Sequence, residues 1–283
     1  MDAPKISVIG PGAMGEAIIA GLLRDGLTPA QHVTASGPDV ERVEELRSVY
    51  GVRPMTDNAA AVEGADVVIL SVKPQRLERV LSGLCGKVPP QALVLSIVAG
   101  AALPSISERL QHKALVRAMP NTPAQIGEGI TVWTASAAVS PEQHELAQRI
   151  LGALGSEIFV EEENYLDMAT ALSGSGPAYV FLFMEAMVDA GVHLGFPRRI
   201  AEQLVTQTVR GSADYFAGRK SHPAALRNEV TSPGGTSAAA LYYLEKAGFR
   251  TAISRAIWAA YERSQELGKD KHRKSPENSA ERD

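Results

Sequence analysis

Residues with the types and spacing for chemistry lie in three glycine-rich segments, of which Gly10–Gly15 is the first. It reads Gly-x-Gly-x-x-Gly, follows the apolar run Ile6–Ile9 and precedes apolar residues at helical spacing in 16–23. A strand, a glycine turn and a helix in this order open a dinucleotide-binding βαβ unit. Its glycines allow a tight turn, a close approach of the backbone to a pyrophosphate and close helix packing. The segment predicts a dinucleotide site, with a purely structural glycine turn as the alternative.

The end of the second predicted strand, 33–36, bears on which dinucleotide binds. Sites for NAD usually place Asp or Glu there, where the carboxylate accepts hydrogen bonds from the ribose 2′-hydroxyl. This chain has Ser36 at that position and Arg42 shortly after it, and a hydroxyl with a nearby cation suits a 2′-phosphate better. Asp39 could reach the ribose if the register shifted. The pattern favours NADP(H), with NAD(H) possible, and leaves Asn58 as either a helix cap or a ribose contact.

The other two glycine-rich segments occur in the second half of the chain. Ser173–Tyr179 reads SGSGPAY and Val230–Ser237 reads VTSPGGTS, and each places small hydroxyl residues and glycines at the predicted start of a helix. Pro177 lies near the first-turn position that proline favours. Helix capping is one interpretation of these segments. The other, which we prefer, is a cradle in which backbone N–H groups and hydroxyls hold a carboxylate.

The elements that must position these residues change character along the chain. After the first two strands, further strands are predicted at 65–72, 93–98, 114–119, 130–134 and 157–160. The run at 65–72 is continuously apolar, as expected for a central parallel strand buried on both faces. Strands that alternate with helical segments, such as 141–154, predict an α/β fold with a doubly wound Rossmann-type domain over residues 1–163.

An all-α domain is predicted to follow over residues 164–267, where helical spacing prevails. Its helix at 177–194 is apolar on nearly every side and must be buried, which a small domain achieves if a second subunit covers it. Further helices are predicted at 198–216, 236–246 and 250–267. Residues 268–283 are charged and polar without periodicity and are expected to form a disordered tail.

Composition narrows the classes of function. A net charge of −4 argues against non-specific binding to nucleic acid and against a polybasic membrane anchor. The single cysteine, Cys85, excludes an internal disulfide, and its apolar neighbours predict a buried, inert thiol. No Cys/His spacing suggests a metal site. We also expect no signal peptide and no membrane span, because the chain enters its first strand at once and no apolar run reaches about 20 residues. The expected location is the cytoplasm.

The motifs GPGAMG, SVKPQ, RAMPNTPA, SGSGPAY and VTSPGGTS, in this order, resemble those of the pyrroline-5-carboxylate reductase family over residues 5 to about 267. The resemblance implies NAD(P)H-dependent reduction of 1-pyrroline-5-carboxylate to L-proline, the last step of proline synthesis. It also implies that the helical C-terminal domain dimerises by interlocking, that subunits share the active site, and that dimers form rings in larger assemblies such as a decamer.

The resemblance also implies roles for individual residues. The pyrophosphate would be bound by Gly10, Gly12, Ala13, Met14 and Gly15, and the adenosine end by Ser36 and Asn58. The nicotinamide side would be lined by Val72, Lys73, Pro74, Met119, Pro120 and Asn121. The substrate would be held by Ser175, Ser232, Gly234, Gly235, Thr236 and Ser237. Thr236 and Ser237 would be catalytic, with a hydroxyl hydrogen-bonding the imine nitrogen. Many family members have Thr where this chain has Ser237, which loses the methyl that restricts the rotamer.

Two other functions are compatible with parts of this pattern. A 3-hydroxyacid dehydrogenase of the 3-hydroxyisobutyrate type shares the architecture but uses a lysine on the first long helix of its second domain. The equivalent helix here, 177–194, contains no lysine. A nucleotide-sensing or scaffold protein could keep the dinucleotide domain without catalysis, but it would not need the segments at 173–179 and 230–237.

Overall fold

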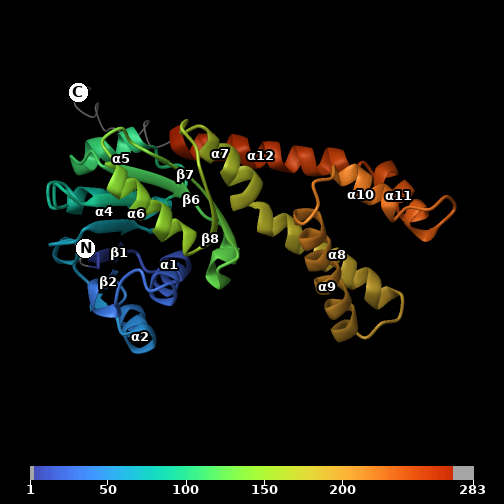
Figure 1. The fold of residues 1–283 in the computed structure, drawn as a ribbon, viewed down its shortest axis with the longest axis horizontal. Helices are drawn as coiled ribbons and strands as arrows, with labels where there is room; N and C mark the ends of the chain where they lie inside the picture. Colours follow the sequence, from blue (N-terminus) through green and yellow to red (C-terminus); the bar gives the residue numbers. More distant parts are fainter. Residues whose placement is uncertain (1–2, 270–283) are drawn as a thin grey trace, which may run out of the picture. The chain divides into compact units, whose positions relative to one another are not determined.

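The computed structural model describes residues 3–269, and its centre is a single eight-stranded sheet (Figure 1). The strands are β1 (Ile6–Ile9), β2 (Val33–Ser36), β3 (Arg53–Met55), β4 (Val67–Leu70), β5 (Leu93–Ser96), β6 (Leu115–Met119), β7 (Gly129–Ala135) and β8 (Gly155–Phe159). Their order is β3-β2-β1-β4-β5-β6-β7-β8, and all neighbours are parallel except the antiparallel pair β6–β7. The order reverses direction beside β1, which is the topology of a doubly wound sheet. The predicted α/β class and strands are confirmed, and β3 is an additional strand.

Side chains alternate between two cores, one on each face of the sheet. Val8 and Ile69 pack with Ile18 and Ile150 on one face. The neighbouring residues of the same strands pack with Leu81 and others on the second face. Both faces are therefore covered by helices, as the continuous apolar strands require. These helices are α1 (Ala13–Arg24), α2 (Val40–Tyr50), α3 (Asn58–Ala61), α4 (Pro74–Leu84), α5 (Leu103–Leu110) and α6 (Pro141–Gly152), with short 3₁₀ turns η1 (Ala30–His32) and η2 (Thr122–Ile126).

The remaining chain is helical. Its elements are α7 (Tyr165–Ala169), a π-helical turn η3 (Thr170–Gly174), α8 (Gly176–His193), α9 (Arg198–Ala217), α10 (Pro223–Glu229), α11 (Thr236–Lys246) and α12 (Phe249–Lys269). The four predicted helices correspond to α8, α9, α11 and α12. Because α12 continues to Lys269, the predicted tail does not begin at 268, and residues 270–283 of it lie outside the described residues.

The described chain divides into two compact units. The sheet-bearing unit comprises residues 3–175 and 260–269, and the helical unit comprises 176–259. Helix α7 and the end of α12 belong with the sheet because Arg117 of β6, whose side chain is 7% exposed, pairs with Glu163 at 2.9 Å and Asp167 at 3.2 Å. Asp167 also accepts a hydrogen bond from Ser264 of α12. This division by compactness places residues 164–175 and 260–269 with the sheet, and the predicted domain ranges 1–163 and 164–267 stay a prediction.

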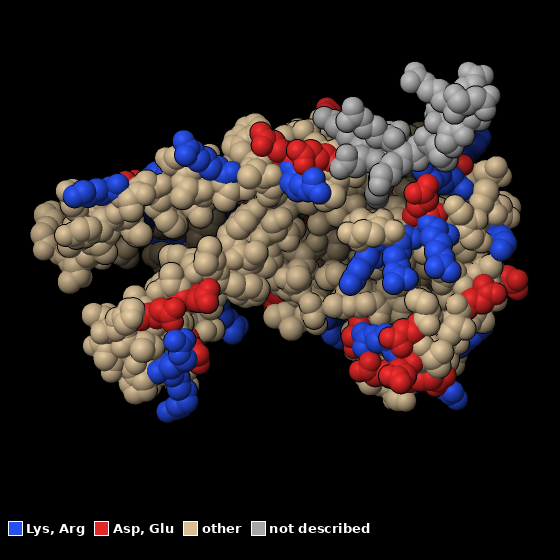
Figure 2. Space-filling view, turned by 180° about the vertical axis from the view of Figure 1, so that it is seen from behind, with Lys and Arg blue, Asp and Glu red and all other residues tan. Residues whose placement is uncertain are grey.

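The helical unit buries very little of its own apolar surface. Its core cluster consists of Val188 of α8 with Ala201 and Val205 of α9. The predicted burial of α8 is not found in the single chain, where Phe181 and Leu182 are 62% and 67% exposed. On the face drawn in Figure 2, wide areas of this unit carry neither acidic nor basic side chains. An apolar helix packed on one side only leaves its other sides for a second subunit to cover.

Candidate functional site

The three glycines of the first turn meet different surroundings. Gly10 has a φ of +85°, and a Cβ there would lie 2.4 Å from Cγ1 of Val72. A Cβ on Gly15 would lie 2.7 Å from Oγ of Ser71, so this glycine lets α1 approach the neighbouring strand end. A Cβ on Gly12 would meet nothing within 4 Å. The fold itself requires Gly10 and Gly15, whereas the space beside Gly12 is open to a ligand.

Helix α1 begins directly at this turn. Gly12 is its N-cap and provides no side-chain cap, and the amide of Glu16 makes the first helical hydrogen bond, to the carbonyl of Gly12. The amides of Ala13, Met14 and Gly15 therefore stand in the first turn, where backbone N–H groups have no intrahelical acceptor. Together with the positive end of the helix dipole they suit a pyrophosphate.

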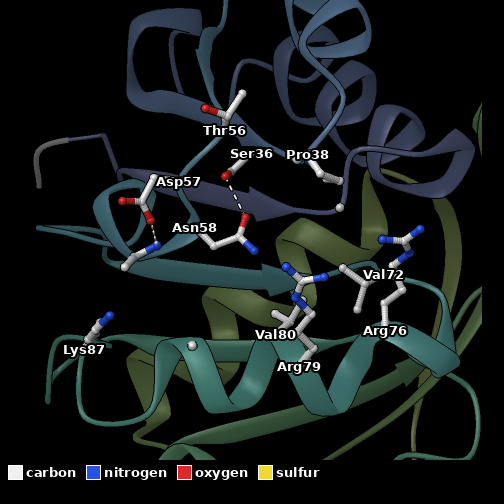
Figure 3. A pocket seen from close by; sticks show the side chains of 14 residues that line it. Ser36, Pro38, Thr56, Asp57, Asn58, Val72, Arg76, Arg79, Val80 and Lys87 are labelled. Carbon is white, nitrogen blue, oxygen red and sulfur yellow. Dashed lines mark hydrogen bonds between the residues drawn. The ribbon is translucent and has the colours of Figure 1, made fainter.

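A cleft of about 480 Å³ lies beside the turn (Figure 3). Its lining consists of Gly10, Ser36, Gly37, Pro38, Thr56, Asp57, Asn58, Ala59, Val72, Arg76, Arg79, Val80, Gly83 and Lys87. Oγ of Ser36 donates a hydrogen bond to Oδ1 of Asn58 at 2.8 Å, so the two residues expected at the adenosine end are in contact. Asp57, rather than Asn58, caps α3, since its carboxylate accepts from the amide of Ala59. The capping interpretation of Asn58 is therefore wrong.

Arg42, the cation expected near a 2′-phosphate, is engaged elsewhere. Its guanidinium donates to the carboxylates of Glu16 and Glu45 and to the carbonyl of Pro11. The hydrogen bond from Arg42 lowers the pKa of Glu16, and a hydrogen bond from Tyr50 adds to the effect against the opposing influence of burial. Arg42 thus ties α2 to α1, and its expected position beside the ribose is not found.

Three basic side chains that sequence reasoning missed line the cleft instead: Arg76, Arg79 and Lys87. They lie on or just after α4, a helix whose core face consists of Leu77, Leu81 and Leu84. The amphipathic spacing of this segment was the available signal. This spacing predicts that the arginines lie on the helix face that points away from the core. It does not predict that this face lies across the cleft from Ser36.

The residues expected on the nicotinamide side follow two parallel strands. Val72, Lys73 and Pro74 come after β4, and Lys73 is the N-cap of α4. Met119 ends β6, with Pro120 and Asn121 directly after it. The carboxyl ends of parallel strands meet at one edge of a sheet, where doubly wound folds bind their ligands. Oδ1 of Asn121 accepts from the amide of Ile130, so this atom already has a structural partner.

The segment 232–237 forms a turn that leads into α11. The amide of Gly235 donates to the carbonyl of Ser232 at 3.0 Å, with Pro233 and Gly234 at the two central positions. Gly234 has a φ of +72°, as a type II turn requires. Gly235 is the N-cap and, in the described chain, no side chain caps this helix start. The capping interpretation therefore fails here, and exposed Thr236 and half-buried Ser237 occupy the first turn.

The segment 173–179 does not form an open helix start. The amide of Ser175 donates to the carbonyl of Thr170 at 2.8 Å, within the π-helical turn η3 that joins α7 to α8. The backbone N–H of Ser175 is thus not free for the predicted cradle, whereas Ser175 as a substrate-binding residue stays a prediction. The physical reason is Pro177, which has no N–H and whose ring crowds the carbonyl four residues earlier, so the helix widens instead of ending.

Cys85 is exposed at the end of α4, so its predicted burial is wrong, because the apolar neighbours face the core while the thiol follows the last helical residue.

Among residues 3–269 no group of three or more His, Cys, Asp or Glu side chains could hold a metal ion. In the same range one helix, Tyr165–His193, is long and apolar enough to cross a membrane by length and composition alone. The expected absence of an uninterrupted apolar run of about 20 residues is a different criterion, and the helix passes this one because α7, η3 and α8 form one helical run.

Comparison with known proteins covers nearly the whole chain. The family model described as pyrroline-5-carboxylate reductase dimerisation matches residues 163–267, and the one described as NADP oxidoreductase, coenzyme F420-dependent, matches residues 5–100. The pyrroline-5-carboxylate reductase of Synechocystis sp. is 44% identical over 94% of this chain and 98% of its own length.

Two solved structures are similar to this chain in both fold and sequence. The pyrroline carboxylate reductase of Plasmodium falciparum, crystallised with NADP bound, is 30% identical, with a TM-score of 0.87 over 95% of this chain and 99% of that one. The 1-pyrroline-5-carboxylate reductase of Streptococcus pyogenes is 34% identical, with a TM-score of 0.86 over 94% of this chain and 100% of that one. With its glycine turns, its doubly wound sheet and these relatives, the chain belongs to the pyrroline-5-carboxylate reductase family.

Proposed function

We propose that this protein reduces 1-pyrroline-5-carboxylate to L-proline, the last step of proline biosynthesis, with NADPH as the preferred hydride donor and NADH as a possible one. The observation that carries the proposal is identity of 44% over 94% of the chain to a reductase of that name. The F420-dependent NADP oxidoreductase match over residues 5–100 and the NADP-bound relative support the choice of cofactor.

The residues around the first turn fit a dinucleotide. The open space beside Gly12 admits a pyrophosphate, and the uncapped start of α1 offers amides of Ala13, Met14 and Gly15 to it. The contact between Ser36 and Asn58 fixes two polar side chains at the adenosine end. When bound, the reduced nicotinamide supplies the hydride. The residues that follow β4 and β6 would line its ring.

The start of α11 is the proposed substrate site. Backbone N–H groups of its first turn and the positive end of the helix would hold the substrate carboxylate, with the turn 232–235 shaping the approach. A hydroxyl of Thr236 or Ser237 would hydrogen-bond the ring nitrogen. Hydride adds to the carbon of the C=N bond while the nitrogen keeps or gains a proton, which yields the secondary amine of proline. The imine carbon is already electrophilic, so positioning contributes more than a strong acid.

The protein forms a homo-oligomer, since residues 163–267 match a dimerisation domain. We propose an interlocked dimer as the building block, with an active site shared between subunits and a decamer as the larger assembly. Ser175 would then join the substrate site. The apolar run Tyr165–His193 is accounted for by this interface, because a helix covered by a second subunit has the same composition as a membrane span. We propose a cytoplasmic enzyme with no membrane or nucleic-acid partner.

Purified protein tests the proposal directly. NADPH oxidation is followed by absorbance with 1-pyrroline-5-carboxylate, and NADP⁺ reduction is followed with 3-hydroxyisobutyrate. We expect turnover only with the cyclic imine, because α8 contains no lysine to serve a hydroxyacid dehydrogenase. Turnover of the hydroxyacid alone would identify that enzyme class instead. Cofactor binding without turnover of either compound would support a nucleotide sensor.

A further inference from the structure

Helix α4 presents a basic face to the cleft beside the first glycine turn. Its core residues Leu77, Leu81 and Leu84 are buried, whereas Arg76, Arg79 and Gly83 lie on the face that lines the cleft. Arg76 and Arg79 are three residues apart and therefore neighbours on the helix surface. Gly83, where an added Cβ would meet nothing within 4 Å, continues this face with no side chain to fill the space.

Neither arginine is used by the protein itself. Within residues 3–269 the guanidinium groups of Arg76 and Arg79 have no hydrogen-bond or ion-pair partner, unlike that of Arg42, which has two carboxylates and a carbonyl. The lining of the cleft holds three basic side chains, those of Arg76, Arg79 and Lys87, against one carboxylate. That carboxylate, on Asp57, already accepts from the amide of Ala59. The charged side chains of the lining are thus mainly basic, and the two arginines are exposed and free to contact a ligand.

The basic face lies across the cleft from the residues expected at the ribose. In Figure 3 the side chains of Arg76 and Arg79 extend from α4 into the cleft, toward the side that holds Ser36 and Asn58. Ser36 ends β2, the position that faces the ribose 2′ group in doubly wound folds. A phosphate at that position would lie between a hydroxyl on one wall and two free guanidinium groups on the other.

We propose that the 2′-phosphate of NADP(H) is bound by Arg79, with Arg76 beside it, from the α4 wall of the cleft rather than by Arg42 from the β2 side. The inference rests on the proposed function for the identity of the cofactor. A planar guanidinium with several donors matches phosphate oxygens, and such charge-assisted hydrogen bonds are the strong ones. Preference for NADP(H) is accordingly set by α4.

The test uses two nucleotides that differ only in the 2′-phosphate, adenosine 2′,5′-bisphosphate and adenosine 5′-monophosphate. Calorimetric titration of the full-length protein gives both dissociation constants, independently of catalysis. We expect Arg79→Gln to weaken the bisphosphate about tenfold and to leave the monophosphate nearly unchanged. Arg76→Gln should have the same effect to a smaller extent. In the wild type, added salt should reduce affinity for the bisphosphate more than for the monophosphate.

Arg47→Gln is the matched control, because it removes one positive charge from the exposed surface of α2, outside the cleft. It should leave both dissociation constants unchanged. The proposal is overturned if Arg79→Gln weakens both nucleotides equally, if it weakens neither, or if wild-type protein does not distinguish them. It is also overturned if folded Arg42→Gln loses the discrimination while Arg79→Gln keeps it. Failure to turn over 1-pyrroline-5-carboxylate would contradict the proposed function. The dissociation constants of the two nucleotides would still test whether Arg79 binds the 2′-phosphate.

Discussion

At the scale of single residues, the glycine fingerprint separates into positions required by the fold and a position left open for a ligand. Gly10 needs its positive φ and has no room for a Cβ beside Val72, and Gly15 allows α1 to approach Ser71. Gly12 has an ordinary φ of −74° and open space where a side chain would be. Three glycines that look equivalent in the sequence therefore predict different consequences when each is replaced.

Replacing Gly12 with Val should leave folding intact and weaken cofactor binding about ten- to a hundredfold, because the new side chain would occupy the proposed pyrophosphate position. Replacing Gly15 with Val should instead lower the melting temperature, since its Cβ would collide with Ser71 and with the carbonyl of Gly10. Circular dichroism melting and NADP⁺ titration separate the two effects. A Gly12→Val protein that binds NADP⁺ normally would refute the pyrophosphate assignment.

Thr236 and Ser237 test the proposed chemistry. Replacing both with Ala should lower kcat roughly a hundredfold, the lower end for loss of a proton-transferring group, while NADP⁺ affinity and melting temperature stay near those of the wild type. Thr236→Ser keeps the hydroxyl and serves as the matched control, which should retain most activity. Steady-state kinetics with 1-pyrroline-5-carboxylate measure both. Unchanged kcat in the double variant would remove the hydroxyl role.

At the scale of elements, a small polar cluster joins α1 to α2 beside the glycine turn. Glu16 in the first turn of α1 accepts hydrogen bonds from Arg42 and Tyr50 of α2. The side chains of Glu16 and Arg42 are 31% and 26% exposed, so solvent screens them less than a fully exposed pair. The two hydrogen bonds hold the carboxylate of Glu16 toward α2 and pair its negative charge. An unpaired carboxylate at the start of α1 would repel the phosphate proposed to bind there.

The lowered pKa of Glu16 gives a pH dependence with a definite sign. Its contribution is fully present above the unfolded value of 4.5 and is lost as the pH falls below that value through the folded pKa. Glu16→Gln should therefore destabilise the protein by about 1 kcal/mol near pH 7, and by less at low pH. Glu44→Gln, which breaks the exposed pair with Arg47, is the control and should change little. Denaturant unfolding across this pH range would contradict the assignment if the difference grew on acidification.

At the scale of the whole molecule, the two compact units differ in how they are stabilised. The sheet-bearing unit has a large core on each face of its sheet. The helical unit, 176–259, has a core cluster of Val188, Ala201 and Val205, which is too small to offset the conformational entropy of ordering its helices. Burial against another subunit is the available source of stability, and it is consistent with the dimerisation-domain match.

A charge on the exposed side of α8 should therefore disrupt assembly. Leu182→Glu places a carboxylate where we propose subunit contact and should weaken self-association at least about tenfold, because an unpaired charge would be buried. Val49→Glu is the matched control, since Val49 is similarly exposed, at 63%, but lies on α2 of the sheet-bearing unit. Sedimentation velocity over a range of concentrations gives the result. Equal assembly of both variants would place the interface elsewhere.

Features that depend on neighbours in the chain were predictable from the residues alone. The strand, turn and helix at 6–24 follow from apolar runs and glycine spacing, and the turn 232–235 follows from Pro-Gly-Gly chemistry. The family resemblance was also predictable from the sequence, because it rests on short motifs in a fixed order. It is confirmed by relatives that match nearly the whole chain.

Partners far apart in the chain could be assigned only once it was folded. Because α2 packs on α1, Arg42 forms an ion pair with Glu16. From its position in the sequence, shortly after β2, Arg42 had been expected beside the ribose of the cofactor. Helix α4 follows β4, two strands after β2 in the chain, but the sheet order places it across the cleft from Ser36. The basic side chains of the cleft therefore come from a segment that the local sequence pattern could not place there. The physical reason is that charges pair with whatever group tertiary packing brings within hydrogen-bond distance, and sequence spacing fixes this only within one helix or turn.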